Sequence, residues 1–456
     1  MNRKTNNRRL RWLVLIVVLI ALALTGIGHG PSWAAARTTP QSVIVTPSAT
    51  VPMLTGTLVP VNNSQGDQTN PHVDRDRASY TNDDFAGHSL IHFFDFSTGT
   101  DSVIPGNGLD RLSDVSGTRI AFSEINTTLG VDQVVLFDTA TQTHTVLPGL
   151  WCTNPALGAN VIAFEDRKSS FTNQGEIDVY GPSIDWVNQL TNDTLFDKNP
   201  ALSATGQTIA WEKCQTDGVG CGIYWGYQVS PPVGYVTGLL TGVGENHRPD
   251  TNDEFVVYTS TRGGETDIYY KPLSNSPEMQ IAIPGEQRDV RISGNLIVFE
   301  SQTAGSDPFF HDVFVYDISS GSLYQVTNTP SDDERLSDIS VWNGTGRVVY
   351  AVAGGFGDFD VYAFTFQVPS SAQGDINGLI ALVQNFNLPR GIENSLVTKL
   401  QDALAALNAS DTATACDSLR SFINQCSAQS GKALTEEQVG QLINAATQIR
   451  TQLGCQ

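Results

Sequence analysis

The chain has 456 residues, of which 26 are lysine or arginine and 47 are aspartate or glutamate, so its formal net charge is −21. Five basic residues and no acidic ones lie in residues 1–36, so a chain without them carries 21 − 47 = −26. Such an acidic surface repels nucleic acid and anionic lipid within a Debye length, and we expect neither as a partner. Only 16% of residues are charged and 41 are glycine, a composition typical of an exported, turn-rich β protein.

The N-terminus has the three parts of a secretory signal. A basic head over residues 3–11 precedes an apolar run over residues 12–24, and small residues follow. The run is short for a membrane span, and residues 32–34 and 34–36 are two A-x-A-like cleavage points. We predict a signal peptide over residues 1–36, export to the periplasm, cell surface or medium, and no membrane insertion after cleavage. A retained membrane anchor is the alternative.

One sequence unit recurs seven times between residues 70 and 366. Its most regular part is an apolar strand that ends in an aromatic residue, and successive copies lie 41 to 51 residues apart. Apolar and polar residues alternate with a period of two and turn residues bound each strand, as in half-buried β-strands. The terminal aromatic residues are Tyr80, Phe122, Phe164, Trp211, Tyr258, Phe299 and Tyr350.

This period predicts an all-β fold, a seven-bladed β-propeller, with six blades as the alternative count. Three or four short strands in about 45 residues make one blade, and radial stacking buries the two faces that a lone blade leaves open. An array of immunoglobulin-like sandwiches is disfavoured because each would need roughly 100 residues.

The copy at residues 200–211, PALSATGQTIAW, resembles the repeat of TolB-like β-propeller proteins; residues 113–122, 290–299 and 337–350 resemble it more loosely. The resemblance implies a propeller over residues 70–368 and says little about activity, because one scaffold hosts many functions. TolB itself resembles a small α/β domain followed by a propeller, and no room for that domain precedes the first blade here. Prolyl oligopeptidase relatives add a hydrolase domain, but the chain has no G-x-S-x-G motif.

Units one to six each carry an outer strand of their own, whereas unit seven ends without one. A propeller avoids an open edge of unpaired N–H and C=O groups. Residues 42–46 and 54–61 both read as short strands, so we expect the segment 37–69 to close the ring by pairing with residues 358–366. We favour 42–46 as the closing strand, because Gly56 lies inside the other segment.

The hydrophobic period changes to that of a helix after a short linker at residues 369–374. Four amphipathic stripes over residues 375–456 predict a small helical bundle, and residues 435–438 (TEEQ) form a capping box before the last helix. The strings LPRGIENSLVTKLQDALAAL and ACDSLRSFINQ resemble the FIMAH-type module of exported bacterial hydrolases and surface proteins. The resemblance implies an accessory or attachment role and no chemistry.

The cysteines favour disulfides, because no pair has the C-x-x-C spacing of zinc or thioredoxin-like sites. Cys214 and Cys221 enclose a hairpin tip in unit four, and we predict that they are bonded. We also predict Cys416–Cys455 in the bundle, with Cys426–Cys455 as the competing pair. Cys152 then remains as a buried thiol.

The sequence offers no nucleophile–base pair and no metal-ligand set. His72 and His247 flank equivalent turns of units one and five, but no third histidine stands at that level. We therefore expect no catalytic residue, metal or cofactor.

One position of the repeat is rich in basic residues. When the units are aligned at the turn before the innermost strand, five of the seven residues there are basic or titratable. A ring of cations near one mouth of a propeller channel suits a carboxylate ligand or an acidic sugar. The alternative is that these residues only form salt bridges with the neighbouring Asp110, Asp197 and Glu334. The ring consists of Thr69, Arg111, Thr153, Lys198, His247, Arg288 and Arg335.

These observations favour an exported, non-enzymatic binding or scaffold protein. Its propeller would engage a protein or an acidic glycan, and the helical tail would attach or dock. An extracellular polysaccharide hydrolase or lyase that uses the propeller channel is the alternative. A periplasmic partner of an envelope complex is a third reading, which rests on analogy with TolB-like proteins alone.

Overall fold

The computed structural model describes residues 41–44, 51–167, 175–274, 276–302, 310–329, 331–353, 358–368, 372–386, 388–409 and 411–455. The predicted signal peptide lies outside these residues. Of the helices that are described, none has the length and apolar character needed to cross a membrane.

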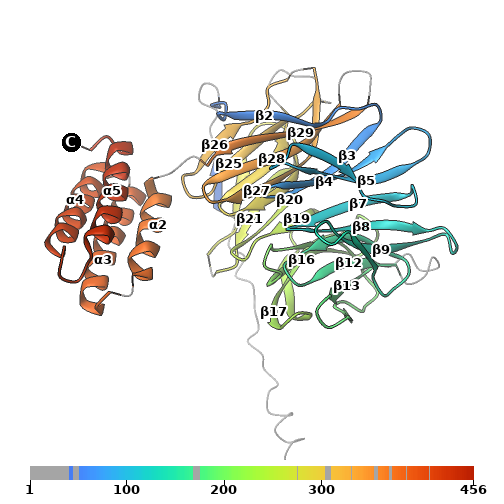
Figure 1. The fold of residues 1–456 in the computed structure, drawn as a ribbon, viewed down its shortest axis with the longest axis horizontal. Helices are drawn as coiled ribbons and strands as arrows, with labels where there is room; N and C mark the ends of the chain where they lie inside the picture. The colour runs from blue at the N-terminus through green and yellow to red at the C-terminus, as the bar shows by residue number, and fades with distance from the viewer. Residues whose placement is uncertain are drawn as a thin grey trace, which may run out of the picture. The chain divides into compact units, whose positions relative to one another are not determined.

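The strands form seven sheets that are the blades of a propeller, which confirms the predicted fold class (Figure 1). From the innermost strand outward, blade 1 contains β3 (Asp67–Asp74), β4 (Arg77–Asp83), β5 (Ser89–Asp95) and β6 (Thr100–Val103). Blade 2 contains β7 (Asp110–Ser116), β8 (Arg119–Asn126), β9 (Val131–Asp138) and β10 (Thr143–Val146). Blade 3 contains β11 (Cys152–Leu157), β12 (Ile162–Asp166), β13 (Glu176–Gly181) and β14 (Trp186–Gln189).

The remaining blades follow the same order. Blade 4 contains β15 (Phe196–Leu202), β16 (Thr208–Cys214), β17 (Gly222–Ser230) and β18 (Gly234–Thr241). Blade 5 contains β19 (Asn246–Thr251), β20 (Phe255–Ser260), β21 (Asp267–Pro272) and β22 (Met279–Ala282), and blade 6 contains β23 (Gln287–Ser293), β24 (Leu296–Ser301), β25 (Asp312–Asp317) and β26 (Ser322–Gln325). Blade 7 contains β27 (Asp333–Trp342), β28 (Thr345–Ala353) and β29 (Phe359–Gln367), with β2 (Gly56–Asn62) on its outer edge.

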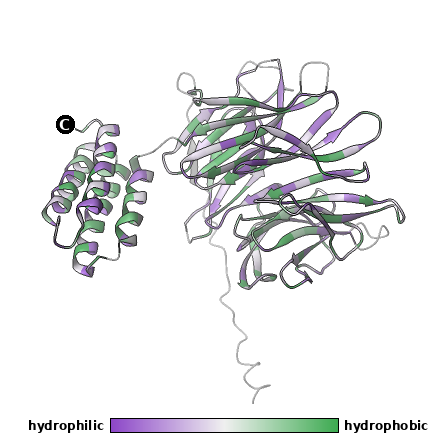
Figure 2. Ribbon diagram, in the orientation of Figure 1, coloured by the Kyte–Doolittle hydropathy of each residue, from purple (hydrophilic) through white to green (hydrophobic). Residues whose placement is uncertain are grey.

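The aromatic residues that mark the repeat form the packing between blades. All seven lie on the second strand of their blade and are buried, from Tyr80 in β4 to Tyr350 in β28. Hydrophobic and hydrophilic residues alternate along many strands (Figure 2), so each blade offers apolar side chains to both neighbours. Complete burial of one such side chain is worth roughly 1.5–3 kcal/mol.

The ring closes with a different N-terminal strand from the one predicted. β2 pairs antiparallel with β29, whereas residues 41–44 form β1 (Gln41–Ile44), which pairs in parallel with β22 of blade 5. The preference for residues 42–46 was wrong because Gly56 is required where it stands. A Cβ on Gly56 would lie 2.5 Å from the Phe364 ring, so only glycine lets β2 approach β29 there.

The N-terminal residues run along three consecutive outer edges. After β1 on blade 5, Leu54 donates its N–H to the Gln325 carbonyl (2.8 Å) and Gln325 donates its N–H to the Pro52 carbonyl (3.0 Å) at the edge of β26. β2 then completes blade 7. We call residues 41–44 and 51–62 the N-terminal strap.

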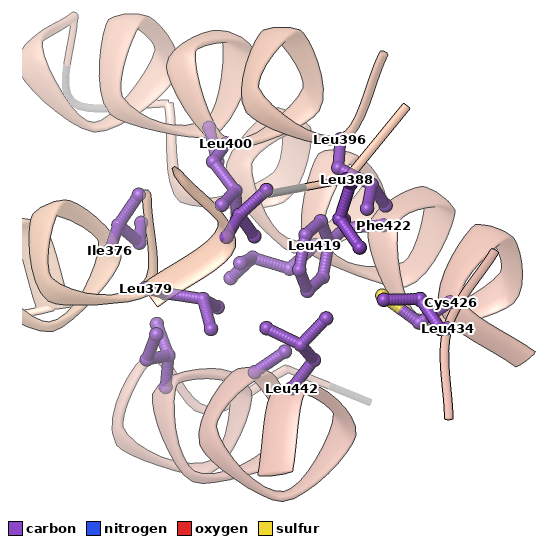
Figure 3. Close-up of a cluster of buried hydrophobic side chains, with 14 residues drawn as sticks. Ile376, Leu379, Leu388, Leu396, Leu400, Leu419, Phe422, Cys426, Leu434 and Leu442 are labelled. Atoms are coloured by element: carbon purple, nitrogen blue, oxygen red, sulfur yellow. The ribbon is translucent and has the colours of Figure 1, made fainter. Parts of the chain in front are cut away.

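The C-terminal residues fold into four helices, α2 (Ala372–Asn385), α3 (Arg390–Asn408), α4 (Thr412–Ala428) and α5 (Glu436–Gln452). The predicted stripes meet in one core, in which Leu400, Leu419, Phe422 and Leu442 are buried (Figure 3). The predicted capping box is present. The Thr435 side chain accepts a hydrogen bond from the Gln438 N–H, and the Gln438 side chain accepts one from the Thr435 N–H.

Both predicted disulfides are present. Cys214–Cys221 joins the end of β16 to the start of β17, and Cys416–Cys455 joins α4 to the C-terminal end of the bundle. Cys152 and Cys426 are buried thiols, so the competing pair Cys426–Cys455 is wrong.

Removal of Cys416–Cys455 should destabilise the helical bundle. The bond closes a loop of 39 residues, and cross-links of this length contribute about 2–4 kcal/mol by restricting the unfolded chain. We expect the Cys416→Ala/Cys455→Ala variant to lower the free energy of unfolding of the helices by that amount, measured by urea denaturation followed by circular dichroism at the helical band. The matched Cys214→Ala/Cys221→Ala variant should leave the helical transition unchanged; an equal loss in both variants would contradict this.

Candidate binding site in the propeller channel

The innermost strands of the blades contact one another in a ring and line the channel. Each of them carries a break in register at the same place, for example between Thr69 and His72 in β3 and between Arg288 and Arg291 in β23. In six blades the first residue inside this break has a left-handed backbone, with φ between 49° and 52°. The six are Asn70, Leu112, Asn154, Asn199, Arg248 and Asp289.

Asparagine tolerates this conformation, whereas Leu112 and Arg248 adopt it at a cost of roughly 1–2 kcal/mol. The preceding blade holds the strained segments in place. Glu212 Oε1 accepts the N–H of Arg248 at 2.5 Å, and Glu165 Oε1 accepts that of Asn199 at 3.0 Å. Backbone strain that neighbouring side chains maintain in this way is a common feature of binding sites.

The cations of the predicted ring lie at equivalent positions, four of them directly before a left-handed residue, and each contacts a carboxylate. Arg111 lies 2.6 Å from Asp132. Arg288 donates to Glu300 at 3.0 Å and to Asp333 at 2.9 Å, and Arg335 also pairs with Asp333.

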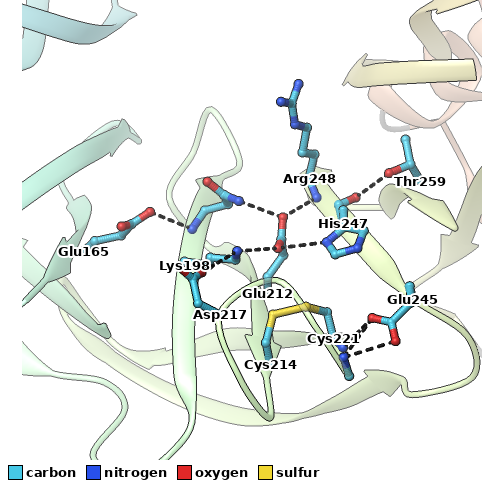
Figure 4. A network of polar contacts seen from close by, with 12 residues as sticks. Glu165, Lys198, Glu212, Cys214, Asp217, Cys221, Glu245, His247, Arg248 and Thr259 are labelled. Carbon is cyan, nitrogen blue, oxygen red and sulfur yellow. Dashed lines mark hydrogen bonds and ion pairs between the residues drawn. A yellow bond between two sulfur atoms is a disulfide. The ribbon is translucent and has the colours of Figure 1, made fainter. Parts of the chain in front are cut away.

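Lys198 and His247 share one buried acid (Figure 4). His247 Nδ1 lies 3.3 Å from Glu212 Oε2, and Lys198 Nζ lies 3.9 Å from the same oxygen. Burial alone would raise the pKa of Glu212, but hydrogen bonds with His247, the Arg248 N–H and Asn199 hold this pKa below its usual value. The pairs neutralise much of the ring, while the Arg248 side chain points away from this network.

The acids that the alternative reading offered as partners make other contacts. Asp197 accepts from the Trp211 indole at 2.7 Å and lies 3.3 Å from Lys213. Burial, followed by the charge of Glu124, raises the pKa of Asp110 to about 7. In the described residues, the ring residues therefore pair with carboxylates other than Asp110, Asp197 and Glu334.

A cavity of about 560 Å³ begins at the left-handed residues and is lined by all seven blades. Its wall carries a second ring, three positions beyond the first, which the sequence analysis did not identify. On blades 3 and 4 this position is alanine, while from blade 5 round to blade 2 acidic and basic side chains alternate. In blade order the ring is His72, Asp114, Ala156, Ala201, Asp250, Arg291 and Asp338.

The three aspartates of the second ring serve as joints between blades. Each accepts the N–H of a residue in the next innermost strand: Asp114 from Leu157 at 2.6 Å, Asp250 from Ile292 at 2.8 Å and Asp338 from Val73 at 2.8 Å. An acid at the same position of three units was the signal that sequence reasoning missed. Burial, partly offset by Arg291, raises the pKa of Asp250 to about 6.

His72 stands between two of these aspartates. Its Nδ1 lies 3.6 Å from Asp114 and 3.5 Å from Asp338. Burial opposes protonation, but the hydrogen bond with Asp338 and the charge of Asp114 raise the pKa of His72. His72 and His247 occupy different positions in their strands, so the structure does not place them in one site.

Arg291 differs from the other channel arginines. Within the described part of the chain its guanidinium forms no ion pair with a carboxylate within 4 Å, although its charge acts on Asp250 and Asp338. It donates a hydrogen bond to the Val290 carbonyl at 2.9 Å. Arg248 lines the same cavity and pairs with Asp289. Burial and the nearby charges of Arg291 and Arg288 lower the pKa of Arg248.

Among the described residues, one set of side chains has the spacing of a metal site, namely Glu212, Cys221 and His247. Cys221 is in a disulfide with Cys214, so its sulfur is not available as the thiolate that binds metals. The set therefore does not support a metal centre.

No protein-family model and no curated protein matches the chain. Among solved structures, the β-propeller domain of the trilobed protease from Pyrococcus furiosus matches at 11% identity, with 67% of this chain and 99% of that one covered and a TM-score of 0.51. The acylaminoacyl peptidase of Pyrococcus horikoshii matches at 13% identity and a TM-score of 0.51, with 69% of this chain covered but only 53% of the peptidase. TolB from Acinetobacter baumannii matches at 15% identity over 65% of this chain and 79% of that one, with a TM-score of only 0.37. At these identities the likeness shows the propeller fold alone.

Proposed function

We propose that this chain is an exported, non-enzymatic binding protein that takes a carboxylate-bearing ligand, an acidic glycan or an acidic protein segment, in its propeller channel. The proposal rests chiefly on Arg291. Its guanidinium faces a cavity within the size range of ligand sites without a carboxylate partner among the described residues. A planar guanidinium is well suited to bind a carboxylate through two parallel hydrogen bonds.

The walls of the cavity favour a ligand with an acidic group and a less polar body. Arg248, on the blade next to that of Arg291, adds a second cation to the wall of the cavity. The alanines of blades 3 and 4 line the same cavity together with Pro155 and Pro200, and these side chains are apolar. The alternating charges on the other blades provide hydrogen-bond partners for hydroxyl groups. This combination suits uronic acid sugars better than a neutral glycan.

The contacts of the channel acids favour binding over hydrolysis. A glycosidase needs two carboxyl groups that are free to act on substrate as acid and as base or nucleophile. Here Asp114, Asp250 and Asp338 each hold a backbone N–H of the next blade, and Glu212 and Glu300 hold the segments with the left-handed residues or their neighbours. The hydrogen bonds that join neighbouring blades account for the positions of these acids.

Export is supported by the two disulfides, since such bonds form in oxidising compartments. The four-helix segment has the place and size of the FIMAH-type module that its sequence resembles. Within the proposal it attaches the propeller to a surface or to a larger assembly.

The change Arg291→Gln should weaken binding of acidic oligosaccharides by at least about tenfold, because it removes a cation that forms no close ion pair with a described carboxylate, while it keeps a similar shape. The measurement is a glycan array with neutral and acidic oligosaccharides, followed by calorimetry of the best acidic probe with the mature chain. Arg420→Gln removes an exposed arginine from α4 and serves as the control that should bind like the parent.

Equal affinities of the parent and the Arg291→Gln variant would refute the site. Binding of neutral sugars in preference to acidic ones would refute the ligand class. Release of new reducing ends or unsaturated products from a bound glycan would show that the channel belongs to a hydrolase or lyase instead.

A further inference from the structure

The outer hairpin of blade 4 is one of two long uncharged segments in this acidic chain; the other, residues 38–66, includes the N-terminal strap. Residues 218–244 contain no aspartate, glutamate, lysine, arginine or histidine, although the chain as a whole carries a net charge of −21. These 27 residues include β17 and β18, the two outer strands of the blade. A long stretch without charge on such a protein requires an explanation.

The hairpin exposes apolar side chains on both of its strands. On β17, Tyr227 and Val229 are 49% and 62% exposed; on β18, Val236 and Leu239 are 64% and 56% exposed. Val243, directly after β18, is also exposed. Val236 pairs with Tyr227 on one face of the hairpin, and Leu239 lies on the other face. Apolar side chains exposed on both faces of one hairpin, as opposed to single exposed residues, favour an interaction site.

The outer edge of β18 is also open. In the described residues its only strand partner is β17, while the outer edges of blades 5, 6 and 7 are covered by the N-terminal strap. Of the other outermost strands in the described residues, β1, β6, β10 and β14 are only four residues long, and β2 has seven residues but contains Pro60, whereas β18 has eight. Proteins usually protect a long edge strand with charges or prolines, and β18 has neither.

We propose that β18 is a self-association surface, on which the edge strand of a second copy of this chain adds antiparallel to form a two-fold dimer. Such an interface uses the same surface patch on both subunits, so one uncharged strand complements itself. The addition of a strand to a blade edge already occurs in this molecule, because β1 and β2 extend blades 5 and 7 in this way.

The charge distribution selects a second copy as the partner. Two chains of net charge −21 repel each other wherever acidic surfaces meet, and repulsion between exposed charges is screened beyond about 8 Å at physiological salt. The uncharged hairpin is therefore a part of the surface where two copies approach with little repulsion. Backbone hydrogen bonds along β18 would set the register, and burial of Val236, Leu239 and their neighbours would supply the free energy.

The test is the oligomeric state of the mature chain, measured by sedimentation velocity over a concentration series. We expect a reversible dimer whose dissociation constant falls as salt is raised, because salt screens the remaining repulsion. Val236→Lys and Leu239→Lys should each raise the dissociation constant by at least about tenfold. Both changes make the chain less acidic, so a general charge effect would act in the opposite direction.

The matched control is Val146→Lys, which places the same charge on β10, the short outer strand of blade 2, where Val146 is likewise exposed. It should dimerise like the parent. Hydrogen exchange gives a second measurement, in which the amides of residues 234–241 become protected as the concentration rises. A monomer at every concentration, or a dimer that both β18 variants leave intact, would overturn the proposal. Since neither outcome involves the channel, the proposed binding function is tested separately.

Discussion

A chain that starts at Ser64, and so lacks the N-terminal strap, is expected not to form a stable propeller. The deletion removes β2, whose residues pair with β29 from Val361 to Phe366, and with it the buried Leu54 and Val61. Loss of the backbone pairs at about 1 kcal/mol each, and of two buried side chains at roughly 1.5–3 kcal/mol each, amounts to roughly 10 kcal/mol. That equals the whole stability of a typical domain, at about 5–15 kcal/mol.

The measurement is thermal unfolding of the truncated and mature chains, with a second truncation as control. A chain that starts at Val51 lacks β1 but keeps β2, and it should lose far less, because β1 adds only four residues to the outer edge of a blade that already has four strands. If the chain that starts at Ser64 melted at the same temperature as the mature chain, β2 would not be what closes the ring.

The change Glu334→Gln should stabilise the propeller above neutral pH by an amount on the order of 3 kcal/mol. Burial raises the pKa of Glu334 to about 8, although a hydrogen bond from Thr329 opposes the shift, while the charge of Asp312 adds to it. No described residue donates a hydrogen bond to its Oε2. Glutamine has the shape of the neutral acid but no charge to bury.

The sign of the pH dependence follows from the direction of this shift. Because the pKa of Glu334 rises from 4.5 in the unfolded chain to about 8 in the fold, its contribution to stability is complete below about pH 4.5 and is lost as pH rises through 8. The variant should therefore match the parent in acid and exceed it at about pH 9, as measured by denaturant unfolding. Glu286→Gln, at an exposed position, is the control and should keep the pH dependence of the parent. A variant that is less stable than the parent at high pH would contradict this account.

The repeat made the propeller predictable from the sequence, because each blade repeats one pattern of buried and exposed residues. The last aromatic of each apolar strand, such as Trp211 or Phe299, is buried as the pattern requires. The closing strand was not predictable in the same way. Gly56 counts against a strand when the sequence is read locally, and only the Phe364 ring on a segment some 300 residues away shows why it is needed.

The candidate site was predictable in part. Alignment of the units places Arg111, Lys198, His247, Arg288 and Arg335 at equivalent positions, and the structure agrees. Whether they bind a ligand remains a prediction. Two of their contacts were not predictable, because Glu212 reaches His247 and Asp333 reaches Arg288 across blade boundaries. Arg291 could not be recognised from the sequence as a candidate binding residue, because its lack of a close carboxylate partner depends on side chains from three blades.

The strap also sets an order of events during synthesis. β2 leaves the ribosome among the first residues of the propeller, but its partner β29 ends at Gln367, so the strand must wait for about 300 further residues. At roughly 5–20 residues per second, that wait lasts about 15–60 s. Blades 1 to 6 contain their own four strands and are able to form in sequence during this time, whereas blade 7 lacks its outer strand until the ends meet. One of the first strands made is thus among the last to be placed, and a chain released before Gln367 leaves the ring open.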